Sequence, residues 1–197
     1  MLFGPQVVKD MGFTSSQAQA MQTLPGFFGL VSIAIASWYV KWFGSHFKGI
    51  LFVRSTVALG SIILLATLNI AARMFALCLL GFGGFGLLGL DPGWLATNVA
   101  SHVTLGGAAS SLLLICGGMG GIVASNIYRN QDAPRYLLGH GINLMSGIMA
   151  TVLAAMARCN MAWLNRKKTQ DLMDISGLSY DDIQCLEEKH PDFRYVY

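Results

Sequence analysis

One stretch of the sequence strongly limits the folds that this chain can adopt. Residues 106–124 carry no charged side chain and lie between two polar connectors. At about 1.5 Å of rise per helical residue, roughly 20 apolar residues cross the hydrocarbon core of a lipid bilayer. The stretch therefore predicts a membrane-spanning helix, and the rest of the chain repeats the same alternation of apolar segment and connector.

Other apolar segments have a similar length, and we expect further spans at about residues 24–40, 50–70, 74–90 and 137–161. Only 12% of the 197 residues are charged, whereas about a quarter are charged in soluble domains. A soluble globule of this length could not bury so many long apolar runs. The sequence therefore predicts an all-α membrane protein with about five complete transmembrane helices.

Lysine and arginine residues near the span ends predict the orientation of the chain. One side receives Lys41, Lys48, Arg54, Arg158, Arg166, Lys167 and Lys168, and the other receives Lys9, Arg73, Arg129 and Arg135. Cytosolic connectors carry the excess of these residues. We therefore expect the tail after Trp163 in the cytosol and the connector around Asn130 outside.

Asp91 and Pro92 interrupt the third expected span, and the helical pattern resumes as far as Asn98. A carboxylate in a span is costly and usually faces a cavity or a partner, and proline frees backbone carbonyls. Two interpretations stay open. The pair could form an interfacial kink, or it could belong to a broken helix that lines a water-filled path.

His140 and Asn143 lie one helical turn apart near the outer end of the last span. Histidine titrates near neutral pH, so the two residues could respond to protons. Alternatively, both side chains hydrogen-bond to a neighbouring helix. The histidines and cysteines of the chain never approach metal-ligand spacing, so we expect neither a metal site nor a cofactor.

Glycines form a third recurring feature. Residues 81–86 match the pattern GxGxxG, but dinucleotide binding also needs a preceding strand, and here the pattern lies inside an apolar span. Close helix packing through small residues is the better interpretation. We expect packing contacts at Gly81, Gly84, Gly89, Gly93, Gly117 and Gly121.

Several motifs resemble those of a known family. They are WLATNVASH, GGIVASNIY, DAPRY, GHGIN and the terminal HPDFRYVY. Together they resemble the last helices and the tail of fungal major facilitator transporters, and among these the allantoate permease-like branch of anion:cation symporters. The resemblance extends from about Val8 to Tyr197 and covers only the C-terminal half of a family member.

This resemblance implies the C-terminal half of a major facilitator helix bundle. Residues 1–21 would then form a truncated helix end and an outer loop, residues 22–162 the transmembrane bundle, and residues 163–197 a cytosolic tail. The implied function is proton-coupled uptake of a small organic anion, such as allantoate, a ureido acid or a vitamin carboxylate, at the plasma membrane. Enzymatic activity is not expected. Candidates for the substrate pathway are Asp91, Asn98, His140 and Asn143.

The implied partners are the lipid bilayer, a small organic anion, protons, and either the missing N-terminal half or a second copy of the chain. Nucleic acid is not expected, because the net charge is only +3 and the basic residues lie at span ends. One alternative stays open. The chain could be a non-transporting membrane remnant of a truncated transporter gene, or of a gene whose boundaries were drawn too short.

Overall fold

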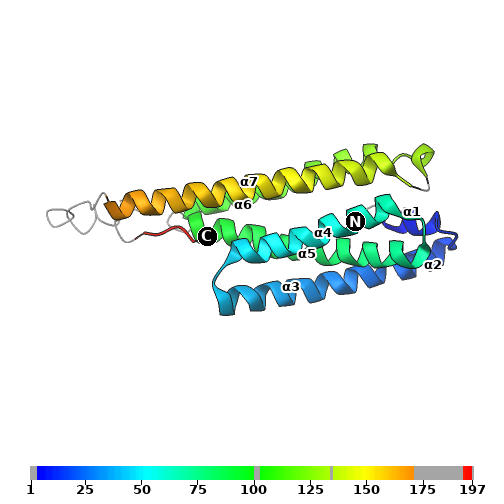
Figure 1. Ribbon diagram of the computed structural model, residues 1–197, viewed down its shortest axis with the longest axis horizontal. Helices are drawn as coiled ribbons and strands as arrows, with labels where there is room; N and C mark the ends of the chain where they lie inside the picture. Colours follow the sequence, from blue (N-terminus) through cyan, green and yellow to red (C-terminus); the bar gives the residue numbers. More distant parts are fainter. Residues whose placement is uncertain (1–3, 100–102, 134, 171–192, 197) are drawn as a thin grey trace.

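The computed structural model describes residues 4–99, 103–133, 135–170 and 193–196, and helices dominate these ranges. Five helices are long and lie side by side, while the short ones gather at one end of the molecule (Figure 1). In chain order the helices are α1 (Gly4–Lys9), α2 (Ser15–Met21), α3 (Thr23–Phe43), α4 (His46–Ala66), α5 (Ile70–Val99), α6 (Val103–Ile127), the 3-10 turn η1 (Asn130–Asp132) and α7 (Leu137–Gln170).

Five helical stretches among the described residues are long and apolar enough to cross a membrane. They correspond to α2 with α3, to α4, to α5, to the apolar part of α6 and to α7. The prediction of an all-α membrane fold with five spans is therefore confirmed. The last helix is longer than expected, because it continues past Met161 to Gln170.

Local sequence explains where several helices begin and end. Thr14 caps α2 through a reciprocal pair of hydrogen bonds with Gln17. Gly44 ends α3 in a left-handed conformation with φ of 64°, which glycine adopts without steric cost. Asn69 accepts a hydrogen bond from the backbone of Ala72 and opens α5. The second span therefore ends at Ala66, and Arg73 belongs to α5 rather than to a connector.

Helix α5 differs from the expected interrupted span. It runs without a break from Ile70 to Val99 and contains Pro92 in its interior. A proline removes one backbone donor, but lipid offers the neighbouring backbone groups no alternative partners, so the remaining helical bonds are kept. The structure therefore does not support the broken helix that Asp91 and Pro92 suggested.

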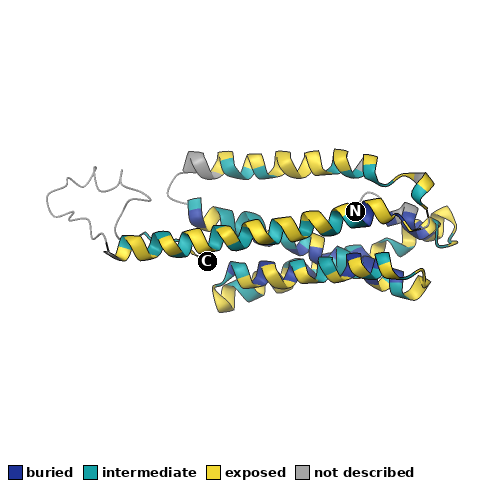
Figure 2. Cartoon of the chain, turned by 45° about the horizontal axis from the view of Figure 1, so that its top comes forward, coloured by how far each residue is buried: buried dark blue, intermediate teal, exposed yellow. Residues whose placement is uncertain are grey.

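Helix α5 packs between α3 and α4, and α7 lies along α4. Buried residues gather where α3, α4 and α5 meet, while the apolar part of α6 contains only exposed and intermediate residues (Figure 2). Glycines allow the close approach. A Cβ atom at Gly81 would overlap the backbone of Pro25 on α3, and one at Gly83 would overlap Val57 on α4.

The other glycines expected at helix contacts behave differently. A Cβ atom added at Gly93 would lie 3.7 Å from the ring of His46, which is an ordinary contact distance. A Cβ atom added at Gly84, Gly89 or Gly117 would meet no atom of another element within 4 Å among the described residues. The expected close packing is therefore not found there, and Gly84 and Gly117 instead line open space between the helices. Gly121 lies on α6, the helix with the least burial.

Two glycines of the same helix provide a matched test of this packing. We expect Gly81→Ala to destabilise the protein by about 1–3 kcal/mol, because the added methyl group meets the α3 backbone. Gly84→Ala should be neutral or slightly stabilising, because its surroundings are open and alanine favours the helix. Thermal unfolding in detergent measures both variants. Equal loss of stability at the two positions would contradict the packing described here.

Candidate functional site

A cavity of about 710 Å³ lies between α4, α5, α6 and α7. Its lining is mainly apolar and includes Leu77 and Leu80 of α5 and Ala150 of α7. Polar side chains gather at one part of this lining, where Tyr128, His140, Asn143 and Ser146 are found. An apolar cavity with a few convergent polar groups has the usual composition of a small-molecule site.

Tyr128 joins the two residues that the sequence singled out on α7. Its hydroxyl oxygen lies 3.1 Å from Nδ1 of His140 and accepts a hydrogen bond of 2.8 Å from Nδ2 of Asn143. The rings of Tyr128 and His140 meet edge to face with centroids 5.3 Å apart. The structure thus places His140 and Asn143 in one cluster. The sequence analysis missed Tyr128, although a tyrosine at a span end is a common interfacial residue.

The donors and acceptors of Tyr128, His140 and Asn143 limit where the protons of this cluster can lie. Burial raises the pKa of Tyr128 to about 12, although the hydrogen bond from Asn143 opposes this shift. The hydroxyl therefore stays protonated near neutral pH. Asn143 donates to the Tyr128 oxygen, and in the His140 tautomer whose Nδ1 accepts the tyrosine proton, a neutral His140 carries its own proton on Nε2.

His140 is 2% exposed, and its Nε2 has no hydrogen-bond partner among the described residues. A buried donor without an acceptor is costly, so such groups are often completed by water or by a ligand. His140 also lines the cavity, and an acceptor that reached Nε2 would complete its hydrogen bonding. A carboxylate or carbonyl oxygen has the required chemistry.

Further charged and polar groups surround this end of the bundle. Arg73 is 2% exposed and lies near enough to Asp10 and to His140 for electrostatic interaction. The hydroxyl of Tyr136 donates a hydrogen bond to Asp10. Tyr136 itself has a φ of 46°, a conformation that aromatic residues rarely adopt. The sequence analysis counted Arg73 among the basic residues near span ends, so it did not identify Arg73 as a buried charge within α5.

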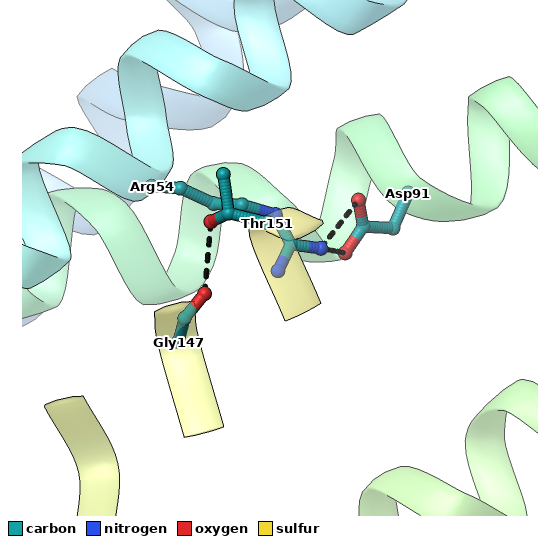
Figure 3. A network of polar contacts seen from close by, with 4 residues as sticks. All are labelled: Arg54, Asp91, Gly147 and Thr151. Atoms are coloured by element: carbon teal, nitrogen blue, oxygen red, sulfur yellow. Dashed lines mark hydrogen bonds and ion pairs between the residues drawn. The ribbon is translucent and has the colours of Figure 1, made fainter. Parts of the chain in front are cut away.

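Asp91 lies elsewhere, in an ion pair with Arg54. The Nη2 atom of Arg54 is 3.2 Å from one carboxylate oxygen and 3.4 Å from the other (Figure 3). Both residues lie about 12 Å along their helices from the same end of the bundle, one from the start of α4 and one from the end of α5. Their matching depth in antiparallel helices is the sequence signal that could have identified the pair.

This pair neutralises two charges that are expensive inside a bilayer. Arg54 also lines a smaller pocket of about 270 Å³ with Gly147 and Thr151 of α7. The Thr151 hydroxyl donates to the Gly147 carbonyl at 2.8 Å, so it is satisfied within its own helix (Figure 3). The sequence analysis counted Arg54 among the basic residues near span ends, whereas in the structure its side chain is paired with Asp91.

Asn98 lies about two helical turns beyond Asp91 on α5, at the end of the bundle opposite to His140 and Asn143. It is 4% exposed, and its side-chain amide bonds to the backbone of Val196 in the C-terminal segment. Of the four pathway candidates, His140 and Asn143 come together, Asp91 pairs with Arg54, and Asn98 contacts the chain terminus. Within the described ranges, no three His, Cys, Asp or Glu side chains are grouped closely enough to hold a metal ion.

Sequence comparison finds relatives over most of the chain. An uncharacterized transporter of Schizosaccharomyces pombe is 30% identical over 198 residues, which are 98% of this chain and 38% of that protein. The MFS-type transporter cnsO of Penicillium expansum is 28% identical over 98% of this chain and 38% of its own length. The high-affinity nicotinic acid transporter of Saccharomyces cerevisiae is 27% identical over 100% of this chain and 37% of its own length.

These relatives are transporters of fungi, and the chain spans a little over a third of their length. No family profile matches the chain, and no solved structure matches it. Together with the five apolar helices, the relatives support an integral membrane protein of the major facilitator type.

The Arg54–Asp91 ion pair can be tested by a double-mutant cycle. We expect Asp91→Leu alone to lower the free energy of unfolding by on the order of 3 kcal/mol, because it leaves Arg54 without its counter-charge. Arg54→Met together with Asp91→Leu should recover most of this loss. Unfolding in detergent provides the measurement, and additive losses in the double variant would show that the two charges are not coupled.

Proposed function

We propose that this chain forms the C-terminal part of a proton-coupled transporter for a small organic anion. The observation that carries the proposal is the buried Nε2 of His140, which has no hydrogen-bond partner among the described residues and belongs to a side chain in the wall of a cavity of about 710 Å³. Small-molecule sites commonly enclose about 300–1,000 Å³. One relative is named a nicotinic acid transporter, and that substrate is an aromatic carboxylate.

In this proposal the carboxylate of the anion accepts a hydrogen bond from His140. Tyr128 and Asn143 hold the imidazole ring in position, and the positive charge of Arg73 nearby favours a negatively charged ligand. An anion beside His140 also stabilises the protonated imidazole, so uptake of the anion is linked to uptake of a proton. The apolar lining of α5 and α7 accommodates the remainder of the molecule.

We further propose that the chain supplies only one wall of the transport path. Transporters of this type move a substrate by rocking two bundles about a shared site. The chain spans 37–38% of the length of its transporter relatives, and α6 is unburied along its apolar part. A second wall would come from an N-terminal half or from a second copy of this chain.

Orientation and location are tested by labelling with a membrane-impermeant maleimide. The native cysteines are first replaced by serine, and Gln131→Cys or Arg194→Cys is then introduced. In intact spheroplasts we expect label only at position 131, because the positive-inside bias places the tail in the cytosol. Label at position 194 without permeabilisation would reverse the orientation, and label at neither position would contradict a plasma membrane location.

Transport is tested in a chimera in which this chain replaces the matching region of the yeast nicotinic acid transporter. We expect nicotinate uptake that depends on a proton gradient, and no uptake by liposomes that contain this chain alone. His140→Gln should weaken apparent affinity about 10–100-fold through loss of a charge-assisted hydrogen bond.

His46→Gln is the matched control for this experiment, because His46 is also buried but lies at the other end of the bundle. Equal effects of the two substitutions would contradict a role for His140 in the site. A correctly inserted chimera without any uptake would instead favour the non-transporting remnant.

A further inference from the structure

The C-terminal segment of residues 193–196 lies across the ends of α5 and α7, where the chain terminus meets the bundle (Figure 1). We propose that α5 and α7 together form a binding site for an extended peptide, that this segment occupies the site, and that its release controls opening of the bundle at this end. We call residues 193–196 the C-terminal latch. The controlling role rests on the transport function proposed above, whereas the binding site does not.

Asn98 of α5 holds one residue of the latch at two points. Its Oδ1 accepts a hydrogen bond of 2.9 Å from the backbone N–H of Val196, and its Nδ2 donates to the Val196 carbonyl at 3.1 Å. The same Nδ2 donates to the Trp94 carbonyl at 2.8 Å, which fixes the amide on its helix. The exchange of N–H and C=O bonds with one residue is the pattern of a paired β-strand.

Asn165 of α7 holds the preceding residue in the same way. Its Oδ1 accepts from the backbone N–H of Tyr195 at 2.9 Å, and its Nδ2 donates to the Tyr195 carbonyl at 2.9 Å. In an extended chain, successive residues direct their backbone groups to opposite sides. Two asparagines on two helices therefore hold consecutive residues from opposite sides.

Side chains add further contacts to this backbone recognition. The indole N–H of Trp94 donates to the Val196 carbonyl at 2.8 Å. The ammonium group of Lys168 lies 4.7 Å from the ring centroid of Phe193 and 5.3 Å from that of Tyr195, within the range of cation–π attraction. The two rings meet edge to face at 5.1 Å. The two asparagines thus bind the backbone of an extended segment, and Lys168 and Trp94 add contacts that include its aromatic side chains.

The two helices that bind the latch also form opposing walls of the large cavity. Leu77, Leu80 and Gly84 of α5 line it together with residues 140–150 of α7. The His140 cluster lies toward one end of these helices, and the latch lies at the other end. While the latch is bound, it fixes the separation of α5 and α7 at its own end. In this proposal the wall that the chain supplies opens at this end by separation of α5 from α7, so opening requires release of the latch.

Release of the latch can be measured on the full chain by electron paramagnetic resonance. A spin label is attached at Arg194→Cys, an exposed position of the latch, after the native cysteines have been replaced by serine. While the latch is bound, we expect the spectrum of an immobilised spin label. Val196→Pro removes the backbone N–H that donates to Oδ1 of Asn98. This should lower the ratio of bound to released label on the order of tenfold. Val196→Ala keeps the backbone and should leave the ratio unchanged.

Two further measurements separate recognition of the latch from damage to the bundle. Asn98→Leu should release the label, whereas Asn126→Leu on α6 should not. Excess synthetic peptide of residues 190–197 should compete with the latch and release the label from the otherwise unchanged protein. Equal mobility in Val196→Pro and Val196→Ala, together with no effect of the peptide, would overturn the binding site.

The controlling role has its own test in the transport chimera. Val196→Pro should raise the rate of uptake several-fold, because opening no longer requires release of the latch. If the label is released but the rate of uptake is the same as with Val196→Ala, the latch binds without controlling transport and that part of the proposal is overturned. The spectroscopic result holds even if the chimera does not transport, so failure of the latch and failure of the transport function are distinguishable.

Discussion

The close approach of α5 to both α3 and α4 is the contact on which the rest of the structure depends. Between apolar helices in lipid there is no hydrophobic driving force, so association relies on van der Waals packing and on buried polar contacts. Gly81 and Gly83 bring the α5 backbone against α3 and α4, and a methyl group at either position would prevent this. One end of α5 carries Arg73, which lies near the His140 cluster, and the other end carries Asn98, which binds the latch.

Several polar groups inside the bundle satisfy one another. Arg54 and Asp91 neutralise each other between α4 and α5. Tyr128 accepts from Asn143 and lies within hydrogen-bond distance of Nδ1 of His140. Nε2 of His140 is buried without a partner among the described residues, as are the hydroxyls of Ser32 and Ser61 and Nδ1 of His46. Of these four residues only His140 lines the large cavity, which is why the proposed function centres on it.

The candidate residues were recognisable from the sequence as unusual polar groups in apolar spans, but their partners were not. His140 and Asn143 share a helix face one turn apart, and the short spacing made their proximity predictable. Tyr128 contacts both residues from the other side of the connector between α6 and α7, and Val196 contacts Asn98 across a separation of 98 residues. Such contacts depend on how helices are placed side by side, and one sequence carries no periodic signal for that placement.

The sequence by itself determined that this chain forms five long apolar helices, because the length of an uncharged run and the thickness of a bilayer leave few alternatives. Local signals such as Gly44 and Asn69 also determined where helices end or begin. Only the tertiary structure decided that α5 continues through Pro92, that Arg54 binds Asp91, and that Gly117 has no packing partner in this chain. These outcomes depend on which helix faces meet, and that choice is made by packing energies summed over the whole bundle rather than by any local pattern.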